Sequence, residues 1–103
     1  MYISITLVKL TDPFYFMCLF ALDLILRLRG ICNIILCGVT TDVCVHTTMR
    51  NANDLGYECL LLEDCCAATD PKNHEASINI VKMQGGVFGS VSTSKKLIEA
   101  VRR

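Results

Sequence analysis

From residue 22 onward, runs of apolar residues alternate with polar turns at the spacing of a strand and helix repeat. The pattern predicts a helix over 22–29 that ends at Gly30, a strand over 33–37 and a second helix over 43–55 that ends at Gly56. Glycine is typical after a helix because it adopts the left-handed conformation of the last turn without a steric penalty. The remaining elements are expected to be a strand over 58–62, a helix from Pro71 to the Gly85–Gly86 pair, a strand over 87–91 and a final helix from 94.

The two central helices each carry apolar residues at positions i, i+4 and i+7, which predict the face that each helix buries. Asp70 directly precedes the second of these helices and is expected to be its N-cap. The predicted buried residues are Val45, Met49 and Ala52 in the first helix and Ala76, Ile80 and Met83 in the second.

Strands that alternate with helices at this spacing are typical of parallel βαβ units, so the expected fold class is α/β. The nearly continuous apolar run over 58–62 indicates a strand that is covered by helices on both faces. Residues 2–8 alternate as in a strand, but the aromatic run that follows has no clean amphipathic period. The chain is therefore divided into a divergent leader over 1–21, with a possible strand, and an α/β domain over 22–103.

Charge and hydropathy narrow the range of partners. Ten basic and ten acidic side chains cancel, which removes the usual electrostatic basis for binding nucleic acid or an anionic membrane. The apolar run over 14–22 is too short to span a bilayer. We therefore expect a small-molecule substrate, no nucleic-acid or membrane partner, and association of the chain into a homo-oligomer.

Seven cysteines are present, and no pair has the Cys-x-x-Cys spacing of a metal or redox motif. An odd number of cysteines in apolar surroundings favours reduced thiols and a cytoplasmic location over a disulfide framework. No metal site and no cofactor is expected.

Of all the cysteines, Cys44 has the sequence position that most strongly indicates a chemical role. It lies where the predicted strand over 33–37 gives way, through a small polar turn, to the helix over 43–55. The positive end of the helix dipole and the unpaired N–H groups of a first turn favour a thiolate over a thiol. In parallel α/β sheets, functional sites form beyond the carboxyl ends of the strands, which is also where this turn lies. Cys44 is therefore the candidate nucleophile.

The segment Gly38-Val-Thr-Thr-Asp-Val-Cys-Val-His-Thr-Thr-Met-Arg50 resembles the isochorismatase-like cysteine hydrolases. The resemblance continues through 52–64, Ala67-Ala-Thr-Asp70 and Gln84-Gly-Gly-Val-Phe-Gly89, and it is nearest to the branch that includes ureidoacrylate and biuret amidohydrolases. It implies a partial doubly wound parallel sheet with about three strands of the usual six, in the order βαβαβα. The matched region corresponds to the carboxyl-terminal half of a family member.

The resemblance also implies a chemistry. Cys44 would attack an amide or ureide carbonyl as part of an Asp-Lys-Cys triad, without a metal or an organic cofactor. The Val39–Thr40 peptide would be cis, and the backbone N–H groups of Thr40 and Cys44 would form an oxyanion hole.

The two other triad members are less clearly matched. The family aspartate follows the first strand, and no similar segment precedes Cys44; Asp12 and Asp23 stand in different contexts. Lys9, which is followed by an aromatic pair at 14–15, is the tentative counterpart of the family lysine. The chain could thus be an inactive relative of the family.

Nearby polar residues allow simpler interpretations. Asp42 is expected to be the N-cap of the helix, which would leave the Cys44 N–H free. His46 follows Cys44 by two residues, so the two side chains point about 200° apart on a helix; His46 is expected to be structural or to line a pocket. His74 is expected to face solvent, Arg50 to face either the exterior or a neighbouring subunit.

Two functions remain open. One is hydrolysis of a C–N bond in a small amide or ureide through Cys44. The alternative is a non-catalytic fragment that interacts with a full-length homologue, because a missing first strand would leave the strand over 33–37 as an exposed edge unless residues 2–8 pair with it.

Overall fold

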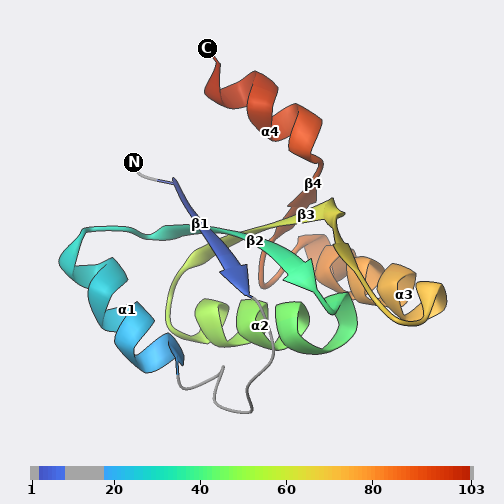
Figure 1. Cartoon of the computed structure of the whole chain (residues 1–103), viewed down its shortest axis with the longest axis horizontal. Coiled ribbons are helices and arrows are strands. Elements are labelled where there is room, and N and C mark those ends of the chain that lie inside the picture. The colour runs from blue at the N-terminus through green and yellow to red at the C-terminus, as the bar shows by residue number, and fades with distance from the viewer. Residues whose placement is uncertain (1–2, 9–17, 103) are drawn as a thin grey trace.

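Four parallel strands form one sheet in the order β1-β2-β3-β4, and helices connect successive strands (Figure 1). The computed structural model describes residues 3–8 and 18–102. Its strands are β1 Ile3–Val8, β2 Asn33–Val39, β3 Glu58–Ala67 and β4 Ser90–Ser92. Its helices are α1 Cys18–Leu28, the π-helical turn η1 Thr41–Val45, α2 His46–Asp54, α3 Pro71–Lys82, the 3₁₀ turn η2 Met83–Gly85 and α4 Ser94–Val101.

β1 pairs with β2 along its whole length, from Ile3 opposite Asn33 to Val8 opposite Gly38. The strand in the amino-terminal segment therefore exists, and it covers the edge of β2 that would otherwise be free. On its other side β2 pairs with β3, with a shift of register between Leu36 and Gly38. The α/β class and the parallel sheet predicted from the sequence are confirmed.

Helices α1, α2 and α3 pack against one face of the sheet around a shared core. On the strands, this core takes alternate residues, as expected from the period of two in a strand. The completely or nearly completely buried members are Leu26 from α1, Ile34 and Leu36 from β2, Val45 from η1, Met49 and Ala52 from α2, Tyr57 before β3, Cys59 and Leu61 from β3, and Ile78 and Val81 from α3. The predicted stripe on the second helix of the chain, Val45, Met49 and Ala52, is buried as expected.

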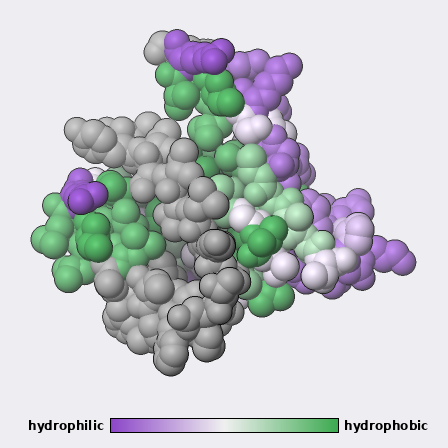
Figure 2. Space-filling model, in the orientation of Figure 1, coloured by the Kyte–Doolittle hydropathy of each residue, from purple (hydrophilic) through white to green (hydrophobic). Residues whose placement is uncertain are grey.

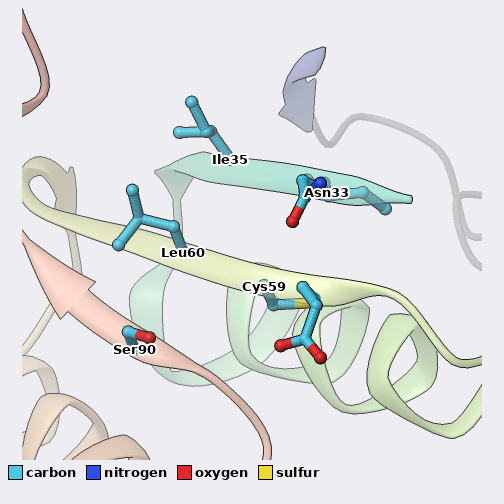
Figure 3. Close-up of a pocket in the computed structure, with 7 residues that line it drawn as sticks. Asn33, Ile35, Cys59, Leu60 and Ser90 are labelled. Carbon is cyan, nitrogen blue, oxygen red and sulfur yellow. The ribbon is translucent and has the colours of Figure 1, made fainter. Parts of the chain in front are cut away.

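The opposite face of the sheet presents Ile35 and Leu60, whose side chains point away from α2 (Figure 3). The sequence predicts helices on both faces of the strand over 58–62. In the structure, helices α1, α2 and α3 all lie on one face, opposite the face that presents Ile35 and Leu60. A continuous apolar run indicates that both faces of a strand are apolar, but it does not identify the elements that cover each face.

The buried face of α3 differs from the prediction. Ser77, Ile78 and Val81 are buried, whereas Ile80 and Met83 are 43% and 61% exposed. Two overlapping stripes fit the same helix, and the one that faces the sheet includes a serine, so a count of apolar residues selects the wrong one. The predicted cap is correct, because the Asp70 carboxylate accepts a hydrogen bond of 2.9 Å from the Lys72 N–H.

The strand predicted over 87–91 begins later, at Ser90. Gly86 and Gly89 both have positive φ angles, so the chain still turns through this segment. Gly89 also has no room for a side chain, because a Cβ there would overlap Met49 Cε and lie 2.8 Å from the Cys59 carbonyl oxygen. The loop between η2 and β4 thus passes directly over α2 and β3.

α4 stands apart from the layer formed by the sheet and the other helices (Figure 1). None of its residues is buried. It is attached through Asp64 of β3, whose carboxylate accepts hydrogen bonds of 2.9 and 3.1 Å from the Ser94 N–H and another from the Ser94 hydroxyl. Among residues 3–8 and 18–102, no helix has the length and apolar character needed to cross a membrane.

Candidate active site

The turn that carries Cys44 starts at the carboxyl end of β2. The peptide bond between Val39 and Thr40 is cis, the geometry that the family resemblance implies. The next residues form η1, a single π-helical turn that runs directly into α2. This turn places Cys44 beyond the end of a central parallel strand, where ligand sites form in such sheets.

Three backbone N–H groups of η1 are directed at the same hydrogen-bond acceptor. The N–H groups of Val43, Cys44 and Val45 lie 3.4, 3.1 and 3.1 Å from the Thr40 carbonyl oxygen. The Cys44 residue is 9% exposed. An N–H group directed at this carbonyl can contribute to an oxyanion hole only by sharing its hydrogen bond.

This arrangement corrects one prediction. Thr40, not Asp42, is the residue that precedes the first turn, and it makes no side-chain capping bond. The Cys44 N–H is therefore not free. The physical reason is that the π-helical turn begins two residues earlier than the α-helical pattern indicates, so Cys44 occupies its fourth position.

Two buried polar atoms of this segment, Asp42 Oδ1 and His46 Nε2, lack a hydrogen-bond partner among the described residues. Burial, with the nearby Arg50 guanidinium, lowers the pKa of His46 below its ordinary value, while Asp42 opposes the shift. The neutral imidazole packs edge-on against Phe88, with ring centroids 5.6 Å apart. Its contacts are those of a structural residue, as the sequence predicts.

Arg50 and Phe88 cover the outer side of this histidine. The Arg50 guanidinium carbon lies 4.3 Å from the centre of the Phe88 ring, a cation–π geometry. The Arg50 side chain thus contacts Phe88 of its own chain while remaining exposed at the surface. Phe88 comes from the loop before β4, so this loop closes over the first turn of α2.

His74 does not simply face solvent, as the sequence predicts. Its Nδ1 lies 2.7 Å from the Thr41 hydroxyl oxygen, and Thr41 is only 1% exposed. A hydrogen bond therefore links the first turn of α3 to the first residue of η1. The spacing contained a signal for this contact, because position 74 belongs to the same i, i+3, i+4, i+7 stripe as Ser77, Ile78 and Val81.

Of the remaining triad candidates, only Asp23 belongs to the part of the chain that the structure describes, and it is not brought to Cys44. Lys9 and Asp12 lie outside the described residues. Asp23 accepts a hydrogen bond of 2.8 Å from Arg27 Nε and another from the Tyr57 hydroxyl. Tyr57 directly precedes β3 at the amino end of the sheet, whereas Cys44 lies beyond the carboxyl end of β2. Asp23 is thus a structural residue of α1.

A pocket of about 270 Å³ lies elsewhere, at the amino ends of the strands (Figure 3). Its lining residues are Asn33, Ile34, Ile35, Glu58, Cys59, Leu60 and Ser90. Cys44 is not among them. This end of a parallel sheet does not usually hold a catalytic site, so the pocket plays no part in the proposed chemistry.

The other thiols provide a useful contrast. Cys32, Cys37, Cys44, Cys59, Cys65 and Cys66 are all free. Burial raises the pKa of Cys59 to about 11 and that of Cys66 to about 11. Because the thiolate is the nucleophile, these two cysteines are poor nucleophiles at neutral pH.

Comparison with known proteins identifies the family. The Isochorismatase domain matches residues 16–100. The chain is 47% identical over 58 residues to the uncharacterized isochorismatase family protein YecD of Escherichia coli O157:H7, an alignment that covers 56% of this chain and 31% of YecD. It is 38% identical over 79 residues to the ureidoacrylate amidohydrolase RutB of Acinetobacter baylyi, covering 76% of this chain and 31% of RutB. The chain spans about a third of the length of these curated relatives.

Solved structures agree with this assignment. An isochorismatase-like hydrolase from Alkaliphilus metalliredigens superposes with a TM-score of 0.71 at 34% identity, covering 78% of this chain and 42% of that protein. The nicotinamidase/pyrazinamidase PncA from Bacillus subtilis superposes with a TM-score of 0.64 at 30% identity, covering 69% and 38%. With the parallel sheet and the turn that follows β2, these similarities lead to one conclusion: the chain belongs to the isochorismatase family.

Proposed function

We propose that this chain carries the nucleophile of a hydrolase that cleaves a C–N bond in a small amide or ureide. The observation that carries the proposal is the position of Cys44 in the helical turn η1, beyond the carboxyl end of β2. The similarity to RutB and PncA supports an amide or ureide as the substrate class.

In the proposed reaction, the Cys44 thiolate attacks the carbonyl carbon and forms a C–S bond. Collapse of the tetrahedral intermediate breaks the C–N bond, and the nitrogen leaves as ammonia or an amine after it takes up a proton. Water then attacks the acyl or carbamoyl thioester, which restores the thiol and releases the acid. The Thr40 N–H and the shared Cys44 N–H are the proposed donors to the developing oxyanion. Lys9 remains the proposed triad lysine.

The test is ammonia release from ureidoacrylate, biuret and simple amides. We expect the wild-type chain to release ammonia and Cys44→Ser to lose that activity, because a serine hydroxyl is a far weaker nucleophile without a strong base. A matched control is Cys32→Ser, which changes an exposed thiol outside the turn. Equal ammonia release by wild type and Cys44→Ser would contradict the role of Cys44.

A second candidate function is that of a non-catalytic partner of a full-length homologue. Two observations favour it. Among the described residues, no carboxylate or lysine forms a hydrogen bond with the Cys44 side chain. In addition, α1 exposes Leu24, Ile25 and Leu28 by 60%, 45% and 78%, as the hydrophobic surface at the left of Figure 2 shows.

A sizing column tests this alternative with two purified proteins, this chain and a full-length homologue. Co-elution that is lost in Leu28→Glu, together with no ammonia release by this chain alone, would favour the partner function. Ammonia release that depends on Cys44 would favour the hydrolase.

A further inference from the structure

His74 makes a side-chain contact that connects α3 to the turn of the candidate nucleophile. The Nδ1 atom of His74 lies 2.7 Å from Thr41 Oγ1, a distance typical of a strong hydrogen bond. The two residues are 33 positions apart in the sequence. The contact is partly buried, so water competes with it less than at an open surface.

Both partners are held in place by their own backbone. His74 lies in the first turn of α3, where its N–H donates to the Asp70 carbonyl at 3.1 Å. Asp70 in turn caps the helix. Thr41 is 1% exposed and is the first residue of η1. The imidazole therefore presents a fixed hydrogen-bonding atom to the start of the turn.

The position of Thr41 matters for Cys44. The residue before it, Thr40, supplies the carbonyl on which the Val43, Cys44 and Val45 N–H groups converge. A rotation of the Thr41 backbone would move this carbonyl and with it the whole first turn. A hydrogen bond on the Thr41 side chain therefore limits the orientation of the Cys44 N–H and Sγ.

We propose that His74 is a positioning residue for Cys44 and acts through the Thr41 hydroxyl. The inference rests on the proposed function, because it takes Cys44 to be the nucleophile. His74 does not touch Cys44 or the substrate in this proposal. Its role is to hold η1 against α3 so that the thiol stays aligned with the N–H groups of its turn.

The experiment measures the reactivity of the cysteine thiols rather than the rate of enzymatic turnover. The full 103-residue chain is alkylated with iodoacetamide at neutral pH, and the labelling rate of each cysteine is measured by peptide mass spectrometry. Cys59 reports unfolding, because it is 5% exposed and reacts only when the core opens. The Cys44 rate reports the position of this thiol, and the Cys59 rate, which is read separately, reports any loss of stability because unfolding raises it.

We expect His74→Ala and Thr41→Val each to lower the Cys44 rate itself by about fivefold, the effect of one hydrogen bond. The double variant should show no further loss, because both changes remove the same contact. His74→Asn should restore most of the Cys44 rate, since its amide places hydrogen-bonding atoms near the position of Nδ1. The matched control is Glu75→Ala, which removes an exposed side chain from the same turn of α3 and should change nothing.

Three results would overturn the proposal. One is an unchanged Cys44 rate in both single variants, even where the Cys59 rate rises. The second is a pair of single effects that multiply in the double variant, and the third is a Cys44 rate that rises. If His74→Ala fails to fold, Thr41→Val and His74→Asn still decide the question. Failure of the proposed function would look different, since Cys44 in the wild type would then react no faster than the exposed Cys32.

Discussion

The imidazole of His46 is neutral, and its buried Nε2 atom has no hydrogen-bond partner among the described residues. Because burial and Arg50 lower its pKa in the folded chain, the unfolded chain binds a proton more readily. The contribution of His46 to stability is therefore present above the ordinary histidine pKa of about 6.5 and is lost as the pH falls toward the lower folded value.

The corresponding prediction is a pH-dependent difference between wild type and His46→Gln. The free energy of unfolding in urea should fall more between pH 7 and pH 5 for the wild type than for the variant, because glutamine does not titrate. His74 is present in both proteins, so its contribution cancels in the comparison. Equal losses in the two proteins would show that the His46 imidazole is not desolvated on folding.

At the residue scale, the sequence predicts that Cys44 lies in the turn after a strand, and the structure places it in η1 after β2, but the predicted cap of this turn was wrong. The motif reports which residues are present, and it does not distinguish a π-helical turn that starts at Thr41 from an α-helical turn that starts later. His74 was missed for a related reason. A lone polar residue near a helix start looks exposed until the stripe that faces the sheet is known.

Among the contacts between elements, Gly89 is important because it lets the loop before β4 approach α2 and β3. A Cβ at this position would overlap Met49 Cε and crowd the Cys59 carbonyl. We predict that Gly89→Ala lowers the free energy of unfolding by about 2–3 kcal/mol, the cost of an overpacked contact. Urea denaturation measures this change.

Gly85→Ala is the matched control. Gly85 also has a positive φ, but a Cβ there has no neighbour within 4 Å. Its cost should be limited to backbone strain of about 1 kcal/mol. Equal losses for the two variants would mean that the close packing of Gly89 contributes nothing.

The attachment of α4 gives a second prediction at this scale. Ser94 hydrogen bonds hold the pKa of the Asp64 carboxyl below its ordinary value, so the carboxylate stays charged at neutral pH. We expect Asp64→Ala to increase amide hydrogen exchange over 94–101 while the exchange of β2 and β3 is unchanged. Glu63→Ala is the control, since the neighbouring Glu63 forms an ion pair of 3.9 Å with Lys82 of α3 and is not bonded to Ser94. Unchanged exchange in α4 would contradict the role of Asp64.

Most elements could be predicted from the sequence, because apolar periodicity, Gly30, Gly56 and the Asp70 cap act locally. The faces could not be predicted equally well. The face of α3 depends on which stripe meets the sheet, and the strand predicted over 87–91 gave way to a loop because glycines favour a turn there. Tertiary packing decides which face of an element is buried and where a strand begins, and a local sequence pattern carries no information about that packing.

For the whole molecule, the sheet places the Cys44 turn beyond the end of a central strand, while α1 exposes apolar side chains on the outside (Figure 2). The family, the α/β class and the parallel strands were all predicted from the sequence. Within residues 3–8 and 18–102, Asp23 does not supply the triad aspartate, because it bonds to Arg27 and Tyr57 at the other end of the sheet.

The central claim is that Cys44, among the cysteines whose side chains the structure describes, is the one prepared for attack on an amide or ureide. The most direct measurement is peptide mass spectrometry after treatment of the folded chain at neutral pH with a thiol-reactive ureide analogue. Burial keeps the Cys59 and Cys66 thiols protonated, so the competition is with the more accessible Cys32 and Cys65. The account predicts that the label accumulates on Cys44 first, whereas equal labelling of Cys32 or Cys65 would contradict it.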